Sequence, residues 1–226
     1  MFETPLKAQF ERIPGLIRMP GRGEVHVWSF RECKSRMLSE DEDRRAEGFV
    51  DPTAKSAFVR GRSGLRDACA SYLSIDPSDV RIAIAASGKP FFADSEEIHF
   101  NLSHSGDHVL AAFSSEEIGI DIENPARCPD FRAIAMRFFL PAESQLIEDA
   151  GDRGRELFFR IWTAKEAIVK LSGHGLASGI KVAESDGGTR GILAGREVFI
   201  QHFLSGELSG AIASFSPFAV KGWFDL

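Results

Sequence analysis

The stretch GRELFFRIWTAKEAIVKLSGHG (residues 154–175) predicts the strongest helix in the chain. Aromatic and aliphatic residues recur along it beside charged ones, which is the pattern of an amphipathic helix with one buried face. Gly173 predicts where this helix ends. A second long helix is predicted for PTAKSAFVRGRSGLRDACASYL (52–73), which begins at a proline, although two internal glycines reduce its regularity. Each half of the chain therefore has one long helix.

Strands are predicted around both helices, because short stretches alternate apolar and polar residues or form short apolar runs. These stretches are EVHVWSF (24–30), VRIAIAA (80–86), IHFNLSHS (98–105), HVLAAFS (108–114), IGIDIEN (118–124), EVFIQHF (197–203), LSGAIAS (208–214) and AVKGWFDL (219–226). A shorter helix is predicted after Ser39, whose spacing to Glu42 forms a capping box. Two more are predicted in FRAIAMRFF (131–139) and from Pro141.

One long helix with antiparallel strands thus occurs in each half. We expect an α+β fold of two similar, pseudo-two-fold-related lobes, each a small antiparallel sheet packed with a long helix. The N-terminal lobe would comprise residues 1–115 and the C-terminal lobe residues 116–226.

Composition excludes several classes of protein. Of the 226 residues, 43% are hydrophobic and 27% charged, which is ordinary for a globular protein and argues against wholesale disorder. The net charge of −6 argues against a nucleic-acid-coating protein. Three scattered cysteines, Cys33, Cys69 and Cys128, predict reduced thiols rather than a disulfide framework or zinc site. We find no apolar stretch long enough for a signal peptide or membrane span, so we expect a cytoplasmic protein with no membrane partner.

The first candidate for chemistry is the pair Asp121 and Glu123 in GIDIE. Side chains two residues apart on a strand project to the same face, so the two carboxylates point the same way while Ile120 and Ile122 face the core. Paired carboxylates repel each other and suit Mg²⁺, particularly when substrate phosphates complete its ligands. The alternative is a solvated strand face without function.

The second candidate lies in WTAKEAIVK on the 154–175 helix. Glu166 and Lys170 are four residues apart and share a helical face. They could form only a surface ion pair, worth a few tenths of a kcal/mol. In the functional alternative Glu166 is a third carboxylate for the metal, and Lys165 and Lys170 neutralise phosphate.

Three further groups could contact phosphate. Gly88-Lys89-Pro90 follows a strand and predicts a turn that exposes backbone amides and one lysine. Ser103 and His104 lie near a strand end, where His104 fits a phosphate donor better than a zinc ligand. A basic cluster on the 52–73 helix contains Lys55, Arg60, Arg62 and Arg66. Each group could instead be an ordinary turn, strand end or solvated helix face.

The order and spacing of GKP, FNLSHS, GIDIE, RFFLPAE and WTAKEAIVK resemble the Sfp-type 4′-phosphopantetheinyl transferases of the holo-[acyl-carrier-protein] synthase superfamily. The resemblance covers roughly residues 45–180. It implies two α+β lobes with coenzyme A bound in the cleft between them. It also implies that the phosphopantetheine arm is transferred to a serine of an apo acyl, peptidyl or polyketide carrier protein and that 3′,5′-ADP is released.

The resemblance also implies roles for individual residues. Asp121, Glu123 and Glu166 match the metal-binding carboxylates. Lys170 matches a catalytic, phosphate-binding lysine, and Lys165 its companion. The remaining matches are to coenzyme A: the loop Gly88, Lys89 and Pro90 at the nucleotide and the pair Ser103 and His104 at the phosphates. The family's arginine for the 3′-phosphate aligns with Ala57, so Arg62, or else Lys55 or Arg60, would replace it.

The residues implicated also fit two other functions. A metal-dependent hydrolase of the coenzyme A diphosphate would use the same carboxylates, with water in place of the serine. A non-catalytic module that binds coenzyme A or a carrier would not need Asp121, Glu123, Glu166 and Lys170 together. The two-lobe length further predicts a monomer, because both lobes belong to one chain.

Overall fold

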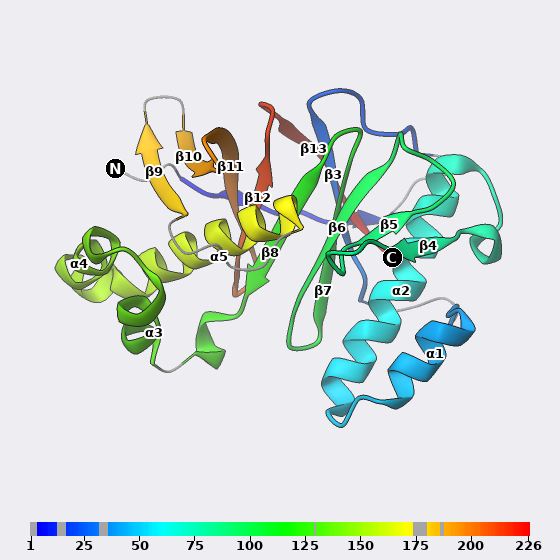
Figure 1. The fold of residues 1–226 in the computed structure, drawn as a ribbon, viewed down its shortest axis with the longest axis horizontal. Coiled ribbons are helices and arrows are strands. Elements are labelled where there is room, and N and C mark those ends of the chain that lie inside the picture. Colours follow the sequence, from blue (N-terminus) through cyan, green and yellow to red (C-terminus); the bar gives the residue numbers. More distant parts are fainter. Residues whose placement is uncertain (1–3, 13–16, 32–35, 129, 174–179, 186–187) are drawn as a thin grey trace. The chain divides into compact units, whose positions relative to one another are not determined.

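The structure, a computed structural model, describes all of the chain except residues 1–3, 13–16, 32–35, 129, 174–179 and 186–187 (Figure 1). Cys33 lies outside the described residues, and Cys69 and Cys128 are free thiols. The chain divides into two compact units. One unit contains residues 9–118 and 218–226, and the other contains residues 1–8 and 119–217.

The two units are not contiguous in sequence, unlike the predicted lobes 1–115 and 116–226. The difference arises because each end of the chain pairs with a sheet of the other half. Strand β1 (Leu6–Lys7) pairs with β11 (Arg196–Ser205) in the 119–217 unit. Strand β13 (Ala219–Asp225) pairs with β3 (Glu24–Ser29) in the 9–118 unit.

In the 9–118 unit, the described residues form a five-stranded sheet in the order β2-β13-β3-β7-β6 and a two-stranded sheet of β4 and β5. The elements not yet bounded are β2 (Glu11–Arg12), α1 (Glu40–Glu47), α2 (Pro52–Leu73), the 3-10 helix η1 (Pro77–Asp79), β4 (Ile82–Ile84), β5 (Pro90–Phe92), β6 (His99–Ser105) and β7 (His108–Ser114). Helix α2 packs on this sheet through Leu65, with Trp28 and Phe113 in the same core.

Helices α1 and α2 begin as their sequences predict. Ser39 accepts a hydrogen bond from the Glu42 backbone, and the Glu42 side chain accepts one from Ser39, so the capping box forms. One of the internal glycines of α2, Gly64, has a packing reason. A Cβ at Gly64 would lie 2.4 Å from the Phe30 ring, so only glycine lets the helix come this close to that ring.

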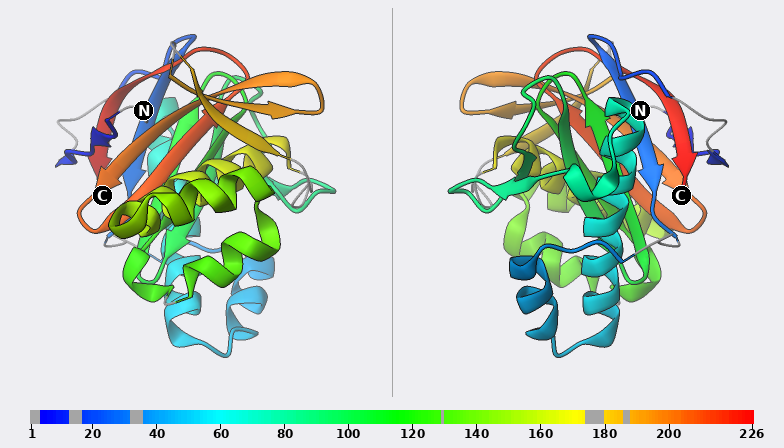
Figure 2. Two further views of the ribbon diagram at one scale, coloured as in Figure 1. Left: turned by 90° about the vertical axis from the view of Figure 1, so that its left-hand side faces the viewer. Right: turned by 90° about the vertical axis from the view of Figure 1, so that its right-hand side faces the viewer.

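In the 119–217 unit, the described residues form a six-stranded sheet in the order β8-β12-β11-β10-β9, with β1 beside β11. Its remaining elements are β8 (Ile118–Glu123), the 3-10 helices η2 (Pro125–Arg127) and η3 (Gly151–Arg153), α3 (Phe131–Phe138), α4 (Pro141–Asp149), α5 (Gly154–Ser172), β9 (Lys181–Ser185), β10 (Gly188–Leu193) and β12 (Leu208–Ser214). Helix α5 lies along one face of this sheet (Figure 2), burying Ala164 and Ile168 against Val198 and Ala211.

The predicted α+β class is confirmed, and both long helices form as expected. Gly173 ends α5 in the left-handed conformation, as an αL cap. The strand predicted for residues 80–86 is shorter, because only Ile82–Ile84 pair with β5. Strands β9 and β10 were not predicted, since their stretch has no clear apolar alternation. In the described part of the chain, no helix combines the length and apolarity that crossing a membrane would require.

Candidate active site

Strand β8 carries two of the candidate carboxylates on the side that faces α5. Its isoleucines, Ile118, Ile120 and Ile122, are fully buried, and Asp121 and Glu123 alternate with them. Gly119 belongs to the same side as the carboxylates. The predicted alternation of this strand is therefore confirmed.

Gly119 permits an unusually close approach of β8 to α5. A Cβ at this position would lie 2.0 Å from the Ala167 carbonyl oxygen and 2.6 Å from the Leu171 backbone nitrogen. Both contacts are with helix backbone, which cannot move aside as a flexible side chain could. Glycine thus sets the strand–helix distance, two residues before Asp121.

Lys170 and Asp121 meet across this contact. The Lys170 ammonium donates a hydrogen bond to Asp121 Oδ1 at 2.6 Å. Asp121 is only 4% exposed, whereas the lysine side chain is partly exposed. The lysine therefore forms a close ion pair between helix α5 and strand β8. The sequence had suggested a pair within the helix, with Glu166.

Glu166, one turn before Lys170 on α5, lies in the same electrostatic environment. Its pKa is raised above the ordinary value, first by burial and then by the negative charge of Asp121, with a smaller contribution from Glu123. Lys170 acts in the opposite direction. The three candidate carboxylates and the lysine are thus brought together within the 119–217 unit.

The carboxylates fit a divalent cation by their chemistry. They supply hard oxygen donors, and the repulsion that raises the pKa of Glu166 is what a bound cation would relieve. Their oxygens are not gathered around one point: among the described residues, no group of three acidic, histidine or cysteine side chains is arranged to hold a metal ion. Asp121 instead has the Lys170 ammonium as a close cationic neighbour.

Lys165 has a different environment from Lys170. Its ammonium is buried and lies 2.5 Å from Glu143 Oε2 on α4 and 4.6 Å from the centre of the Phe139 ring. The same Glu143 oxygen accepts a hydrogen bond from the Leu140 backbone at 2.9 Å, so it also caps α4. Lys165 thereby joins α4 to α5.

Glu143 was missed as a candidate residue. The signal that could have found it is its place in RFFLPAE, where it follows Pro141 at the third position of a predicted helix. Such a glutamate is expected to turn back to the helix start. Its second role, as the partner of a buried lysine 22 residues away, depends on tertiary packing.

The Gly88-Lys89-Pro90 turn belongs to the 9–118 unit. Gly88 has a φ of +84°, which favours glycine, and Pro90 begins β5. The Lys89 ammonium lies 2.6 Å from Glu117 Oε2. His99 and Lys89 lower the pKa of Glu117 to about 2, against the opposing effect of burial. The candidate nucleotide lysine therefore has a carboxylate partner just before β8.

The side chains of Ser103 and His104 do not point toward a common site. They are neighbours on β6, so their side chains project from opposite faces of the sheet. Ser103 is buried, and His104 is exposed on the face that contains Phe100 and packs on α2. Strand geometry thus separates the two predicted phosphate contacts.

Arg62 is buried in an ion-pair network instead of on a solvated helix face. Its Nε lies 3.5 Å from Glu42 Oε1, and Arg66 lies 2.8 Å from the other oxygen of that carboxylate. Burial, more than any neighbouring charge, lowers the pKa of Arg62. Arg62 and Arg66 thus attach α1 to α2.

Arg60 extends to a different part of the unit. Its guanidinium donates hydrogen bonds to the carbonyls of Arg31 and Asp107. Asp107 lies in the β6–β7 turn, three residues after His104. Of the two arginines, Arg60 is therefore the one that is bonded to the turn following Ser103 and His104.

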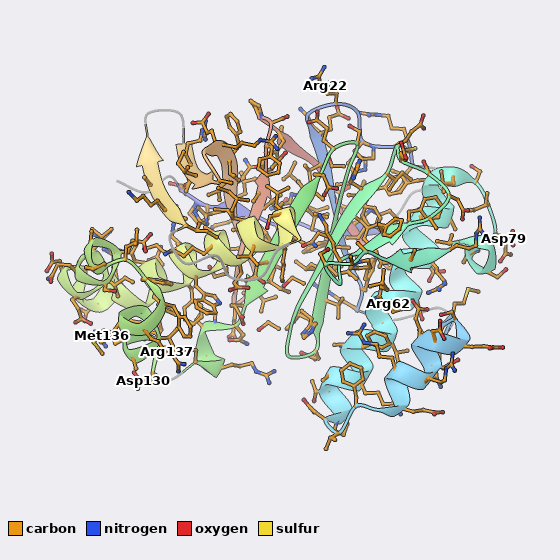
Figure 3. All side chains as sticks on the ribbon, in the orientation of Figure 1. Arg22, Arg62, Asp79, Asp130, Met136 and Arg137 are labelled. Carbon is orange, nitrogen blue, oxygen red and sulfur yellow. The ribbon has the colours of Figure 1, made fainter. Side chains whose placement is uncertain are left out.

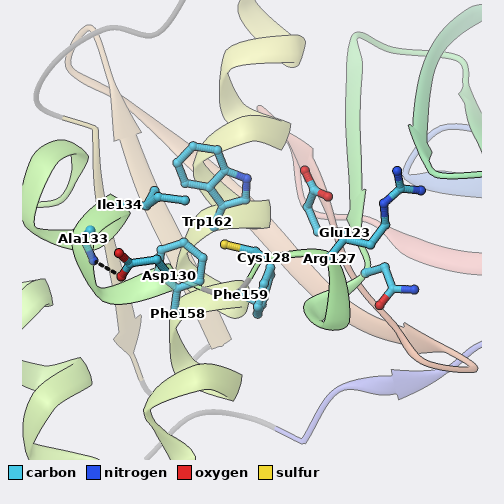
Figure 4. A pocket seen from close by; sticks show the side chains of 10 residues that line it. Glu123, Arg127, Cys128, Asp130, Ala133, Ile134, Phe158, Phe159 and Trp162 are labelled. Atoms are coloured by element: carbon cyan, nitrogen blue, oxygen red, sulfur yellow. Dashed lines mark hydrogen bonds between the residues drawn. The ribbon is translucent and has the colours of Figure 1, made fainter. Parts of the chain in front are cut away.

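A pocket of about 540 Å³ opens beside Glu123 within the 119–217 unit (Figure 4). One wall consists of residues that follow β8, and the other of aromatic side chains from α5. The pocket is lined by Glu123, Asn124, Arg127, Cys128, Asp130, Ala133, Ile134, Phe158, Phe159 and Trp162. It combines an apolar wall with polar side chains, among them the carboxylates of Glu123 and Asp130.

Comparison with known proteins gives the family. Residues 117–211 match the family model described as the 4′-phosphopantetheinyl transferase superfamily, and residues 28–116 match the model of the N-terminal part of these transferases. The chain belongs to the 4′-phosphopantetheinyl transferase superfamily, and phosphopantetheinyl transfer is its activity.

Several proteins named as 4′-phosphopantetheinyl transferases are similar to it. It is 36% identical over 167 residues to the 4′-phosphopantetheinyl transferase HetI of Nostoc sp. (68% of this chain and 70% of HetI). It is 34% identical over 155 residues to Sfp of Bacillus subtilis (63% and 68%). It is also 34% identical over 164 residues to the human L-aminoadipate-semialdehyde dehydrogenase-phosphopantetheinyl transferase (67% and 53%). Neither a hydrolase nor a non-catalytic module has support from these similarities.

Proposed function

We propose that this chain transfers the 4′-phosphopantetheine arm of coenzyme A to a serine hydroxyl of an apo carrier protein, with Asp121, Glu123, Glu166 and Lys170 at the reacting diphosphate. The observation that carries this assignment is the Lys170–Asp121 ion pair beside Glu166. This arrangement provides an ammonium group for the diphosphate and carboxylates for its metal counter-ion.

The reaction forms one bond and breaks another at the β-phosphorus of coenzyme A. The serine oxygen attacks this phosphorus, the bond to 3′,5′-ADP breaks, and 3′,5′-ADP leaves with the bond's electrons. Lys170 stabilises negative charge that develops on the phosphate oxygens. Glu166 accepts the serine proton, directly or through a water molecule.

Asp121, Glu123 and Glu166 are the residues that would hold Mg²⁺. The cation would offset the charge of the diphosphate and of the departing 3′,5′-ADP oxygen. Support comes from the hard oxygen donors and from their mutual repulsion.

The nucleotide half of coenzyme A is assigned to the 9–118 unit. Lys89, in the Gly88–Pro90 turn, would pair with a phosphate in exchange for Glu117. For the 3′-phosphate, we favour Arg60 over Arg62, because Arg62 is held by Glu42 whereas Arg60 is bonded to the turn that follows His104.

The pocket beside Glu123 is assigned to the phosphopantetheine arm. The arm extends from the diphosphate, so it must begin near the carboxylates. Aromatic side chains such as Phe158 and Trp162 offer its methyl and methylene groups an apolar surface, and its amides can reach the polar wall.

Helix α3 is assigned to carrier docking. Met136 is 75% exposed and Phe138 is 47% exposed, and Arg132 and Arg137 belong to the same short helix. Figure 3 shows Met136 and Arg137 at the surface of this helix. Carrier proteins are usually acidic, so a basic and apolar surface complements them although the whole chain carries a net charge of −6.

A direct test is to incubate the chain with coenzyme A, Mg²⁺ and a panel of apo carriers, and to follow carrier mass together with 3′,5′-ADP. We expect the carrier to gain the mass of the arm in step with 3′,5′-ADP release. Release of 3′,5′-ADP without a carrier would instead indicate a hydrolase. Calorimetric Mg²⁺ titration of the coenzyme A complex should show binding that Asp121→Asn removes.

We also propose that the chain acts as a monomer, because one chain contains both the nucleotide residues and the carboxylates. Light scattering under turnover conditions should give a protein mass near 24.9 kDa. A dimer mass would contradict this part of the proposal.

A further inference from the structure

Arg155, the second residue of α5, holds the segment that follows the carboxylate strand. Its Nη1 donates hydrogen bonds to the carbonyl oxygens of Pro125 and Cys128, each at 2.8 Å. Its guanidinium also lies over the Phe131 ring, 4.8 Å from the ring centre. One side chain thus contacts two carbonyls of the segment between β8 and α3, and the ring of the first residue of α3.

This segment forms one wall of the pocket beside Glu123. Two of its side-chain hydrogen bonds are short-range: Asn124 caps η2, and Asp130 caps α3. Neither bond fixes the distance between the segment and α5. The contacts of Arg155 do span that distance, because they run from α5 to the carbonyls of Pro125 and Cys128.

Arg155 itself does not line the pocket. The opposite wall is formed by Phe158, Phe159 and Trp162, which follow Arg155 on the same helix (Figure 4). Arg155 therefore connects the two walls from outside. A guanidinium suits this role, because it presents several N–H donors in a plane and can stack on an aromatic ring at the same time.

We propose that Arg155 is a positioning residue for the phosphopantetheine arm: it holds residues 124–128 at the separation from α5 that the arm requires. This inference rests on the proposed function, which assigns the arm to this pocket. It concerns binding of the arm and not binding of the nucleotide, whose assigned residues belong to the other unit.

The test compares coenzyme A with 3′,5′-ADP, which lacks the arm. In Arg155→Met, which keeps a long side chain but removes all donors, the KM for coenzyme A should rise on the order of tenfold, as expected for loss of hydrogen bonds from a charged group. The inhibition constant of 3′,5′-ADP should not change. Arg155→Lys should restore most of the affinity, because an ammonium can donate to both carbonyls.

Arg153→Met is the matched control, since it removes the same charge from an exposed position two residues away. It should leave the KM for coenzyme A unchanged. If Arg155→Met does not fold, Arg155→Gln keeps one donor group and should give an intermediate KM. The inference is overturned if Arg155 variants melt early with an unchanged KM, or if the 3′,5′-ADP constant rises in parallel. A wild-type chain that neither transfers the arm nor binds 3′,5′-ADP in a calorimetric titration would overturn the proposed function itself.

Discussion

Lys170 on helix α5 and Asp121 on strand β8 lie 49 residues apart in sequence and 2.6 Å apart in the structure. The carboxylate is buried and the ammonium is partly exposed. This pair connects the two elements that carry all the candidate metal carboxylates. Substituting Lys170 is therefore a direct way to distinguish a role in the reaction from a role in stabilising the fold.

Lys170→Met keeps the aliphatic stem and removes the charge. We expect kcat to fall by roughly 10²-fold or more, because the ammonium is most valuable where phosphate charge develops in the transition state. Steady-state kinetics and thermal melting on the same sample measure both effects. Lys221→Met, at an exposed position, controls for the loss of one lysine. Early melting with normal turnover would remove Lys170 from the active site.

Gly119→Ala tests the close approach of β8 and α5. The added methyl group would meet the Ala167 carbonyl at 2.0 Å, so strand and helix must separate. We expect a loss of about 1–3 kcal/mol in unfolding free energy, typical of overpacking, together with reduced kcat. Gly48→Ala is a suitable control, because Gly48 has an ordinary helical φ of −76° and more room. Urea unfolding would contradict the prediction if Gly119→Ala and Gly48→Ala both had the unfolding free energy of the parent chain.

The 3′-phosphate assignment can be tested with dephospho-coenzyme A. Coenzyme A should bind more tightly by about 1.5–3 kcal/mol, the range for a hydrogen bond to a charged group. Arg60→Ala should remove this preference. Arg62→Ala should keep it and lower stability instead, because Glu42 loses one of its two arginines. Isothermal titration calorimetry with both ligands measures the preference of each variant. Loss of the preference in Arg62→Ala would instead support Arg62 as the residue that binds the 3′-phosphate, as the sequence suggested.

The Lys165–Glu143 pair predicts a loss of stability more than a loss of nucleotide affinity. Both side chains are buried, and removing one partner of a buried pair typically costs about 3–5 kcal/mol. Lys165→Met should therefore melt early while its 3′,5′-ADP affinity stays unchanged. The double variant Lys165→Met, Glu143→Gln should recover part of the stability. A normal melting curve with weak 3′,5′-ADP binding would show that Lys165 holds phosphate.

Stability should fall as the pH is lowered below 6.5, in part because of His202. Burial, and to a smaller extent Arg160, lowers the pKa of this histidine from 6.5 to about 3. Between these values the unfolded chain binds a proton that the folded chain does not, so acid favours unfolding. The contribution of His202 between pH 7 and pH 5 is about 2 kcal/mol.

His202→Leu should make this pH dependence shallower, as measured by urea unfolding at pH 7 and pH 5. Both ring nitrogens of His202 are buried without hydrogen-bond partners in the described part of the chain, so leucine should also be tolerated at pH 7. His108→Gln, at an exposed position, serves as the control. An unchanged slope in His202→Leu would contradict the prediction.

Local patterns in the sequence were enough to predict the elements that carry the carboxylates. Alternation placed Asp121 and Glu123 on one side of a strand, and the 3.6-residue period placed Glu166 and Lys170 on one side of a helix. These are short-range regularities of backbone geometry. The family followed from the order of such motifs and was confirmed by comparison.

Long-range pairing could not be predicted in the same way. Nothing local distinguishes Lys165, buried against Glu143, from Lys170, which reaches Asp121. Arg62 likewise looks like any arginine on a helix until α1 packs against it. The choice between a binding role and a packing role depends on which residues come together in the fold.

Strand β13 has a consequence for the order of folding during synthesis. It supplies one neighbour of β3, whose other neighbour is β7, and it is translated only after residues 119–217 have been made. Until then β3 presents an unpaired edge, which is a site for aggregation or chaperone binding. The 9–118 unit therefore completes its sheet only after residues 119–217 have been made.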